Sequence, residues 1–226
     1  MNNKIKNIEY SRNTNKKINF YKKFDFENKF FLSTTDDRVS KHLYQYEQIK
    51  KIKNVSGDIL ELGVFKGSSL ARLILYKNLL CIKKKIYGFD VFSKLKKTKE
   101  DKDFEDYKNW ALELGKVPSK KTLELNLSKR NLQKNVYLID GDIRKTLSKN
   151  IPKILSFVNL DLDIYDPTKH CLPILWSFLS KGGLILLDNY KVFPGETKAV
   201  NEFVVQNKIR INQIKFGKRT FYFLKK

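Results

Sequence analysis

The sequence predicts a doubly wound α/β fold, in which helices cover both faces of a mostly parallel sheet. Short apolar runs rich in branched residues alternate with longer segments of helical periodicity along most of the chain. Several of these runs end abruptly in acidic residues, a pattern typical of strands that open onto a ligand-binding crevice. The chain finishes on two apolar runs around Gly217-Lys218, which predict an antiparallel hairpin.

Length and composition indicate one domain with an extension. The 226 residues and the apolar share of 41% fit one sizeable α/β domain, expected over residues 41–226. Residues 1–40 are basic with interspersed aromatic residues, which favours a clamp over the domain or over a partner. Residues 91–134 read as a polar insertion or lid. We expect a cytoplasmic protein, because the sequence shows neither an apolar run long enough to span a bilayer nor a secretion signal.

The expected helices and strands follow in order along the chain. The first half predicts a helix at 41–54, a strand at 59–62, a helix from 68 to about 78 and a strand at 85–89. The insertion carries two helical patterns, at 104–114 and 120–132. The second half predicts strands at 136–139, 154–160 and 184–187, helices at 143–149, 168–181 and 199–206, and hairpin runs at 209–216 and 219–224. Gly182-Gly183 are expected to stop the helix that begins near Thr168.

The formal charge of +22 raises the question of nucleic-acid binding. Most of the positive charge is lysine, scattered singly or in short groups along the whole chain. This even spread indicates a composition bias and argues against a nucleic-acid-binding patch, although a basic surface still favours phosphate-bearing small molecules. The two cysteines and two histidines are too few for a thiolate or imidazole metal cluster.

A glycine-punctuated turn links the first expected strand to its helix. It reads Gly63-Val64-Phe65-Lys66-Gly67, and Ser68 and Ser69 open the helix. A strand, a glycine turn and a helix N-terminus in this order let the backbone approach a ligand closely. The next strand ends in Asp90, about 25 residues past the turn, where an acidic side chain can accept hydrogen bonds from ribose hydroxyls. Together these features favour a ligand that carries a ribose.

Oxygen-bearing side chains follow two further strands. Asp161 and Asp163 come directly after the run 154–160, and Asp188-Asn189 follow the run 184–187. Because the carboxyl ends of parallel strands face the same crevice, we expect Asp161, Asp188 and Asn189 to converge there. Three oxygen ligands suit Mg²⁺, with Mn²⁺ or Fe²⁺ as alternatives. The competing interpretation is that these residues only cap helices and turns.

Five motifs then stand in order from about Gly57 to Phe203. They are Gly57-Asp58-Ile59-Leu60-Glu61-Leu62-Gly63-Val64-Phe65-Lys66-Gly67-Ser68-Ser69, Gly88-Phe89-Asp90-Val91-Phe92, Asp161-Leu162-Asp163-Ile164-Tyr165, Gly182-Gly183 through Asp188-Asn189-Tyr190, and Gly195 with Ala199-Val200-Asn201-Glu202-Phe203. This series resembles the motifs of S-adenosylmethionine-dependent methyltransferases, and more narrowly those of the macrocin O-methyltransferase family, which methylates sugar hydroxyls. The resemblance implies a Rossmann-like sheet of seven mostly parallel strands ending in an antiparallel hairpin. It also implies a homo-oligomer.

The resemblance implies roles for single residues. The cofactor, S-adenosylmethionine, would contact Glu61 and Gly63 along its methionine part, Ser69 near its carboxylate, Asp90 at the ribose, Asp142 and Ile143 at the adenine, and also Val64, Phe65 and Asp161. The divalent metal would be bound by Asp161, Asp188 and Asn189.

Two positions depart from related patterns. The family usually has Asp-Asp where this chain has Asp188-Asn189, and catechol O-methyltransferase, a metal-dependent relative, is similar to this chain there. Catechol-type enzymes also use a lysine as general base at the position of Ile164, which cannot take a proton. The expected catalytic residues are therefore Asp161 and Asp163, and Asp163 either accepts the proton or only anchors the loop.

The expected activity is metal-dependent transfer of the methyl group of S-adenosylmethionine to a hydroxyl of a nucleotide-activated or surface-polysaccharide sugar. Three alternatives stay open. The positive charge would fit an RNA methyltransferase, and the Asp188-Asn189 pair would fit a phenol or catechol methyltransferase. The fold alone would also fit a non-catalytic binding domain. The Tyr165 motif and the helix expected after Gly195 favour the sugar.

Overall fold

The structure is a computed structural model that describes residues 20–93, 108, 115–217 and 219–226. The chain divides into two compact units between Val39 and Ser40. The first unit contains helix α2 (Phe20–Ser33) and the start of helix α3 (Asp36–Lys51), and the second contains the sheet. The helical pattern expected at 104–114 lies, apart from Lys108, outside the described residues.

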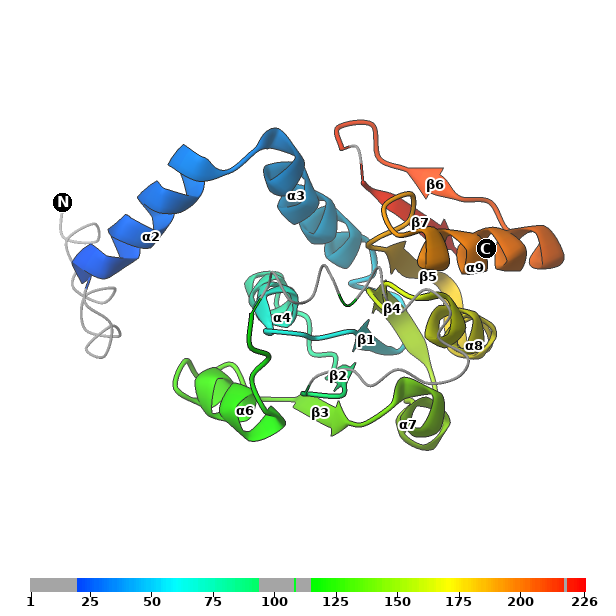
Figure 1. Ribbon diagram of the computed structural model, residues 1–226, viewed down its shortest axis with the longest axis horizontal. Helices are drawn as coiled ribbons and strands as arrows, with labels where there is room; N and C mark the ends of the chain where they lie inside the picture. Colours follow the sequence, from blue (N-terminus) through cyan, green and yellow to red (C-terminus); the bar gives the residue numbers. More distant parts are fainter. Residues whose placement is uncertain (1–19, 94–107, 109–114, 218) are drawn as a thin grey trace. The chain divides into compact units, whose positions relative to one another are not determined.

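A seven-stranded sheet in the order β3-β2-β1-β4-β5-β7-β6 forms the centre of the second unit (Figure 1). The parallel strands are β1 (Asp58–Leu62), β2 (Ile86–Asp90), β3 (Val136–Asp140), β4 (Leu155–Leu160) and β5 (Leu179–Leu187). The antiparallel strands are β6 (Asn212–Gln213) and β7 (Phe221–Leu224). This topology confirms the predicted fold class. The strand order also reverses between the parallel strands β1 and β4. Open α/β sheets bind ligands at such a point.

Helices cover both faces of this sheet (Figure 1). One face packs against α3, α4 (Ser68–Leu79) and α6 (Lys120–Ser128). The other packs against α7 (Ile143–Asn150), α8 (Tyr165–Phe178) and α9 (Pro194–Asn207). Alternate strand residues point into the two cores: Leu60 lies in one and Ile59 in the other. Burial on both sides explains why these strands read as nearly continuous apolar runs.

Helices α3, α8 and α9 begin earlier than the sequence periodicity predicts. Helix α3 starts at Asp36, with Asp36 and Asp37 in its first turn, where carboxylates interact favourably with the helix dipole. Helix α9 starts at Pro194, a residue that suits the first helical position because it has no N–H to leave unbonded. Among the described helices, none combines the length and the apolar character needed to cross a bilayer.

Gly182 and Gly183 do not stop a helix, and this prediction is wrong. Helix α8 ends before Leu179, and strand β5 begins at that residue. The two glycines lie inside β5, where its register against β4 shifts. Gly182 takes a φ of +78°, its N–H donates to the carbonyl of Lys225, and the N–H of Lys225 donates to the carbonyl of Gly183. The glycines therefore form an irregularity in a strand, which their conformational freedom permits.

Candidate active site

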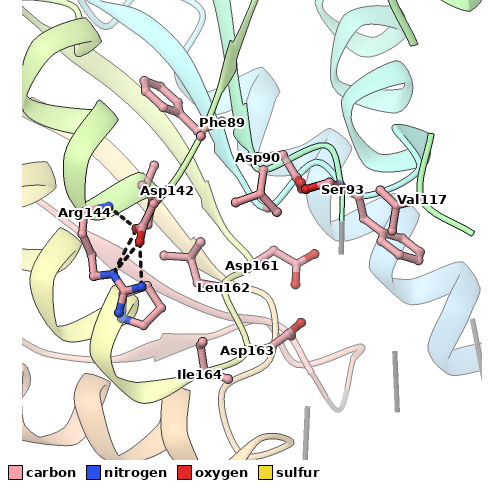
Figure 2. Close-up of a pocket in the computed structure, with 16 residues that line it drawn as sticks. Phe89, Asp90, Ser93, Val117, Asp142, Arg144, Asp161, Leu162, Asp163 and Ile164 are labelled. Atoms are coloured by element: carbon pink, nitrogen blue, oxygen red, sulfur yellow. Dashed lines mark hydrogen bonds and ion pairs between the residues drawn. The ribbon is translucent and has the colours of Figure 1, made fainter. Parts of the chain in front are cut away.

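A cavity of about 150 Å³ opens at the carboxyl ends of the central strands (Figure 2). The lining includes Gly63, Phe65, Asp90, Asp142, Ile143, Arg144, Asp161, Leu162 and Asp163. Three other residues expected at the cofactor have their side chains elsewhere. Val64 packs in the core, and Glu61 and Ser69 take part in a separate buried network.

The glycine turn after β1 passes directly against the loop that follows β4. Gly63 has a φ of +86°, and a Cβ atom there would overlap the carbonyl oxygen of Asp161. Only glycine fits a position that combines this conformation with so close an approach. The backbone of the turn thus reaches one end of the cavity beside Asp161.

Asp90, at the end of β2, holds the loops at the cavity wall. Its Oδ2 accepts the N–H of Phe65 at 2.7 Å, and its Oδ1 accepts the N–H of Phe92 at 2.8 Å. Burial raises the pKa of Asp90, and these backbone hydrogen bonds partly oppose the rise. Phe65 and Phe92 have φ values of +49° and +42°. Non-glycine residues rarely adopt this conformation, and those that do are concentrated at functional sites.

Asp142 and Arg144 form a fixed pair on the opposite wall (Figure 2). Asp142 caps α7 by accepting the N–H of Arg144 at 2.9 Å, and its Oδ2 lies 2.7 Å from the Arg144 guanidinium. Partial burial alone would raise the pKa of Asp142, but the hydrogen bonds and charge of Arg144 hold it below its ordinary value. Sequence reasoning did not identify Arg144, although an arginine two residues after a helix cap is a recognisable partner.

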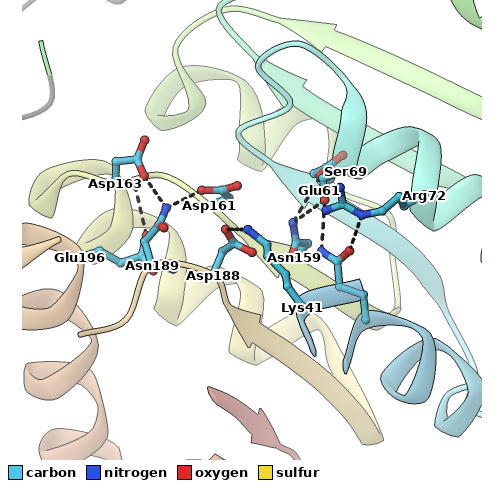
Figure 3. A network of polar contacts seen from close by, with 11 residues as sticks. Lys41, Glu61, Ser69, Arg72, Asn159, Asp161, Asp163, Asp188, Asn189 and Glu196 are labelled. Atoms are coloured by element: carbon cyan, nitrogen blue, oxygen red, sulfur yellow. Dashed lines mark hydrogen bonds and ion pairs between the residues drawn. The ribbon is translucent and has the colours of Figure 1, made fainter. Parts of the chain in front are cut away.

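The loops after β4 and β5 come together in an acidic cluster, which we define as Asp161, Asp163, Asp188 and Glu196 with the attached Asn189 (Figure 3). The Nδ2 of Asn189 lies 2.6 Å from Asp161 Oδ1 and 2.5 Å from Asp163 Oδ1. Asp163 has a φ of +64°, so its loop is held in a rarely populated conformation. Burial, followed by the charge of Asp188, raises the pKa of Asp163 to about 7.

Glu196 links the loop after β4 to the loop after β5 through hydrogen bonds. It is fully buried in the first turn of α9 and accepts the N–H of Asp163 and the N–H of Asn189, each at 3.1 Å. Burial, together with the charges of Asp163 and Asp188, raises the pKa of Glu196 to about 8. The structure shows a side chain that fixes both loops.

Lys41 is the second residue that sequence reasoning missed. Its Nζ lies 2.5 Å from Asp188 Oδ2, and it reaches the cluster from α3, far from the motifs (Figure 3). Burial raises the pKa of Asp161 well above its ordinary value, the charges of Asp188 and Asp163 add to the rise, and Lys41 opposes it. With 46 lysine and arginine residues in the chain, no sequence signal distinguishes Lys41.

The fit of a divalent ion depends on the orientation of Asn189. Within the described residues, no three His, Cys, Asp or Glu side chains are arranged as a metal-binding group. The expected set differs in kind, since it combines the carboxylates of Asp161 and Asp188 with an amide. A half-turn of the Asn189 amide would direct its oxygen, in place of its nitrogen, toward Asp161. The donors would then all be oxygens around buried negative charge, which suits a hard cation.

A second buried network lies around Glu61, on the side of α3 and α4 (Figure 3). Asn159 Nδ2 lies 3.3 Å from Glu61 Oε1 and 3.4 Å from Ser69 Oγ. Gln45 Nε2 donates to Ser69 Oγ at 3.2 Å, and Arg72 Nε donates to Gln45 Oε1 at 3.0 Å. Burial raises the pKa of Glu61 to about 8, although Ser69 and Arg72 oppose the rise. The expected contact of Glu61 and Ser69 with the cofactor stays a prediction.

Comparison with known proteins identifies relatives of the chain. The sequence matches the family described as Macrocin-O-methyltransferase (TylF) over residues 25–225. Demethyldecarbamoylnovobiocin O-methyltransferase of Streptomyces niveus is 27% identical over 157 residues, which are 66% of this chain and 59% of that protein. The alignment therefore spans less than two thirds of this relative.

Solved structures share the fold. The O-methyltransferase NovP superimposes with a TM-score of 0.73 at 20% identity, covering 82% of this chain and 79% of NovP. The calicheamicin methyltransferase CalS11 superimposes with a TM-score of 0.64 at 20% identity, covering 94% of this chain and 87% of CalS11. At these identities the structures support the fold alone. Because the family match extends over nearly the whole sequence, the chain belongs to the macrocin O-methyltransferase family.

Proposed function

We propose that this protein is an S-adenosylmethionine-dependent O-methyltransferase that acts on a sugar hydroxyl. One observation carries the proposal beyond family membership. A single cavity is lined both by Asp90, the residue expected at the ribose, and by Asp161 and Asp163 of the acidic cluster. Cofactor and acceptor sites would thus share one wall, which is what direct transfer between two bound molecules requires.

Residues of the cavity would hold the cofactor, which supplies a methyl group on a positively charged sulfur. Asp90 would accept hydrogen bonds from the ribose hydroxyls, and Ile143 offers an apolar contact for the adenine beside Asp142. Gly63 would let the backbone approach the methionine part, because a larger residue cannot occupy that turn. The protein would mainly align the reacting atoms, as methyl transfer needs no covalent intermediate on the enzyme.

Asp163 is the proposed proton acceptor. The sugar hydroxyl oxygen forms a bond to the methyl carbon, the bond from sulfur to that carbon breaks, and the hydroxyl proton passes to Asp163. Three observations support this role: Asp163 lines the cavity, its loop is strained, and its pKa is raised to about 7, which suits a base at neutral pH. Ile164 beside it is buried and cannot replace it.

Asp161, Asp188 and Asn189 would hold a divalent ion, with Mg²⁺ expected and Mn²⁺ or Fe²⁺ as alternatives. When bound, such an ion lowers the pKa of an adjacent hydroxyl. The contribution of the chain is a set of buried oxygens. Burial and the charge of Asp188 raise the pKa of Asp161, so a cation at this point would stabilise the ionised form of Asp161.

The proposed acceptor is a nucleotide-activated or surface-polysaccharide sugar. The formal charge of +22 favours a substrate that carries phosphate. CalS11, which shares the fold, is described as a TDP-rhamnose 3'-O-methyltransferase, so one structural neighbour acts on a nucleotide sugar. A homo-oligomer in the cytoplasm completes the proposal, as predicted from the sequence.

Labelled methyl transfer tests this function. The protein is incubated with methyl-labelled S-adenosylmethionine and Mg²⁺ and is offered nucleotide sugars, a catechol or RNA. The proposal predicts label on a nucleotide sugar and loss of transfer on addition of chelator. Label on RNA or on the catechol would support the corresponding alternative. Failure to bind S-adenosylmethionine in calorimetry would contradict a methyltransferase of any kind.

A further inference from the structure

We propose that Lys41 is a tethered cation that holds Asp188 when no divalent ion is bound, and that the ion must displace it. This inference rests on the metal site of the proposed function and adds a residue outside every sequence motif of the site. It makes the side chain of Lys41 a competitor of the ion.

The ammonium group of Lys41 lies directly against Asp188. Its Nζ lies 2.5 Å from Asp188 Oδ2, and the exposed fractions of the two side chains are 23% and 8%. Asp188 is one of the three expected ligands, so the ammonium group already occupies one oxygen of the proposed site. The pair is half-buried, and solvent therefore screens it less than a surface ion pair.

Lys41 brings a positive charge to the acidic cluster through its hydrogen bond to Asp188. Four acidic side chains share the cluster, and a buried group of carboxylates is costly to ionise without a cation nearby. Lys41 thus serves the electrostatic role that a bound ion would serve.

The two cations exclude each other. A divalent ion binds carboxylate oxygens at about 2.0–2.6 Å, which is the space that the Lys41 ammonium takes beside Asp188. Two positive charges at one oxygen also repel each other. Binding of the ion therefore requires Lys41 to leave Asp188.

The side chain of Lys41 can move away from Asp188. Lysine has a four-carbon stem with several rotatable bonds, and its ammonium is strongly hydrated. The side chain is partly exposed, so a change of rotamer can place the ammonium in water without moving helix α3. The chain would then have two states of the same loops, with either Lys41 or the ion holding them. If Lys41 occupies Asp188 in about nine molecules of ten, the apparent affinity for the ion falls about tenfold.

Mn²⁺ binding, followed by electron paramagnetic resonance, tests this competition. The proteins are the wild type, Lys41→Met and Lys41→Gln, with Lys50→Met as the control, because Lys50 is an exposed lysine of the same helix. We expect both Lys41 variants to bind Mn²⁺ about tenfold more tightly and the control to match the wild type. Mn²⁺ should also raise the Tm of Lys41→Met more than that of the wild type.

A measurement on the unaltered protein avoids any effect of substitution on folding. The rate of acetylation at Lys41 is followed by mass spectrometry, and Mg²⁺ should increase it while leaving Lys50 unchanged. Equal or weaker Mn²⁺ binding by the Lys41 variants, or no effect of Mg²⁺ on acetylation, would overturn the inference. Wild-type binding of S-adenosylmethionine in calorimetry is scored separately, so failure of the Lys41 competition is distinguishable from failure of the proposed function.

Discussion

Two buried polar networks lie on either side of strand β4. The Glu61 network contains one carboxylate, Arg72 lies close enough to lower its pKa, and its side chains do not line the described cavity. The acidic cluster contains four carboxylates and one nearby lysine, and Asp161 and Asp163 line the cavity. A raised pKa alone does not distinguish the two networks, because burial raises the pKa of both Glu61 and Glu196 to about 8.

What separates the networks is the excess of like charge beside a cavity. In the Glu61 network, protonation of Glu61 removes the one carboxylate charge and leaves the hydrogen-bonded contacts to Asn159 and Ser69. In the acidic cluster, carboxylates repel one another and are held in place by Glu196 and Asn189. The acidic cluster therefore keeps negative charge beside the cavity, where a ligand can interact with it.

Removal of the proposed base gives the largest expected effect. Asp163→Asn keeps the shape of the side chain but cannot accept the proton, so kcat should fall about 10²–10⁴-fold. The affinity for S-adenosylmethionine should stay within about twofold, as calorimetry would show. Asp140→Asn, at the exposed end of β3, is the matched control. A rate close to that of the wild type would assign Asp163 to loop anchoring instead.

A change at Asp90 should act on the cofactor and spare the chemical step. Asp90→Ala removes the acceptor expected at the ribose and the two bonds to the N–H groups of Phe65 and Phe92. The Kd for S-adenosylmethionine should rise by about tenfold or more, because hydrogen bonds to a charged group contribute about 1.5–3 kcal/mol each. At saturating cofactor kcat should change little. Unaltered affinity in calorimetry would remove Asp90 from the cofactor site.

Glu196→Gln should weaken the link between the two acidic loops. The amide nitrogen of glutamine cannot accept a hydrogen bond, so either Asp163 or Asn189 loses its N–H partner. We expect kcat to fall about tenfold, which corresponds to a rise of ~1.4 kcal/mol in the activation free energy, because the reacting groups are less well aligned. The KM for the cofactor should change little. Glu202→Gln, on the exposed face of the same helix, should behave as the wild type. Equal loss in both variants would indicate a general effect on α9.

The Glu61 network should respond in stability. In the folded protein the pKa of Glu61 is about 8, against 4.5 for the free group, so folding favours the protonated form. The wild type therefore loses stability as the pH rises from about 4.5 to 8. Glu61→Gln has no such proton to lose, and its Tm should fall less over the same range. Parallel Tm profiles for the two proteins would show that Glu61 ionises freely.

Sequence patterns predicted the layers of the fold because buried strands and amphipathic helices leave strong periodic signals. They failed at Gly182 and Gly183, since a glycine pair permits a helix end and a strand irregularity equally well, and only pairing with β4 and the C-terminal strand decides between them. Sequence patterns also predicted that Asp161 and Asn189 lie at one edge of the sheet, and the structure places these two residues in contact. Parallel strands make such an edge predictable from residue order alone.

The supporting residues were not predictable in the same way. Lys41 and Glu196 reach the cluster from helices whose direction depends on tertiary packing. Lys41 is one of many lysines, and Glu196 reads as an ordinary first-turn acid. Glu61 lies in a motif that resembles a cofactor-binding turn, and its side chain accepts a hydrogen bond from Asn159, a contact that the motif did not indicate.

Carbon NMR of bound S-adenosylmethionine, labelled with ¹³C at the methyl group, tests the central arrangement most directly. If the methyl donor lies in the cavity that Asp161 lines, Mn²⁺ bound by Asp161 and Asp188 should broaden the methyl resonance strongly, while Mg²⁺ should leave it sharp. The broadening should disappear in Asp188→Ala, which lacks one ligand oxygen but leaves the cavity lining intact. A methyl resonance that stays sharp when the wild type is saturated with Mn²⁺ would separate the ion from the methyl donor and contradict the account.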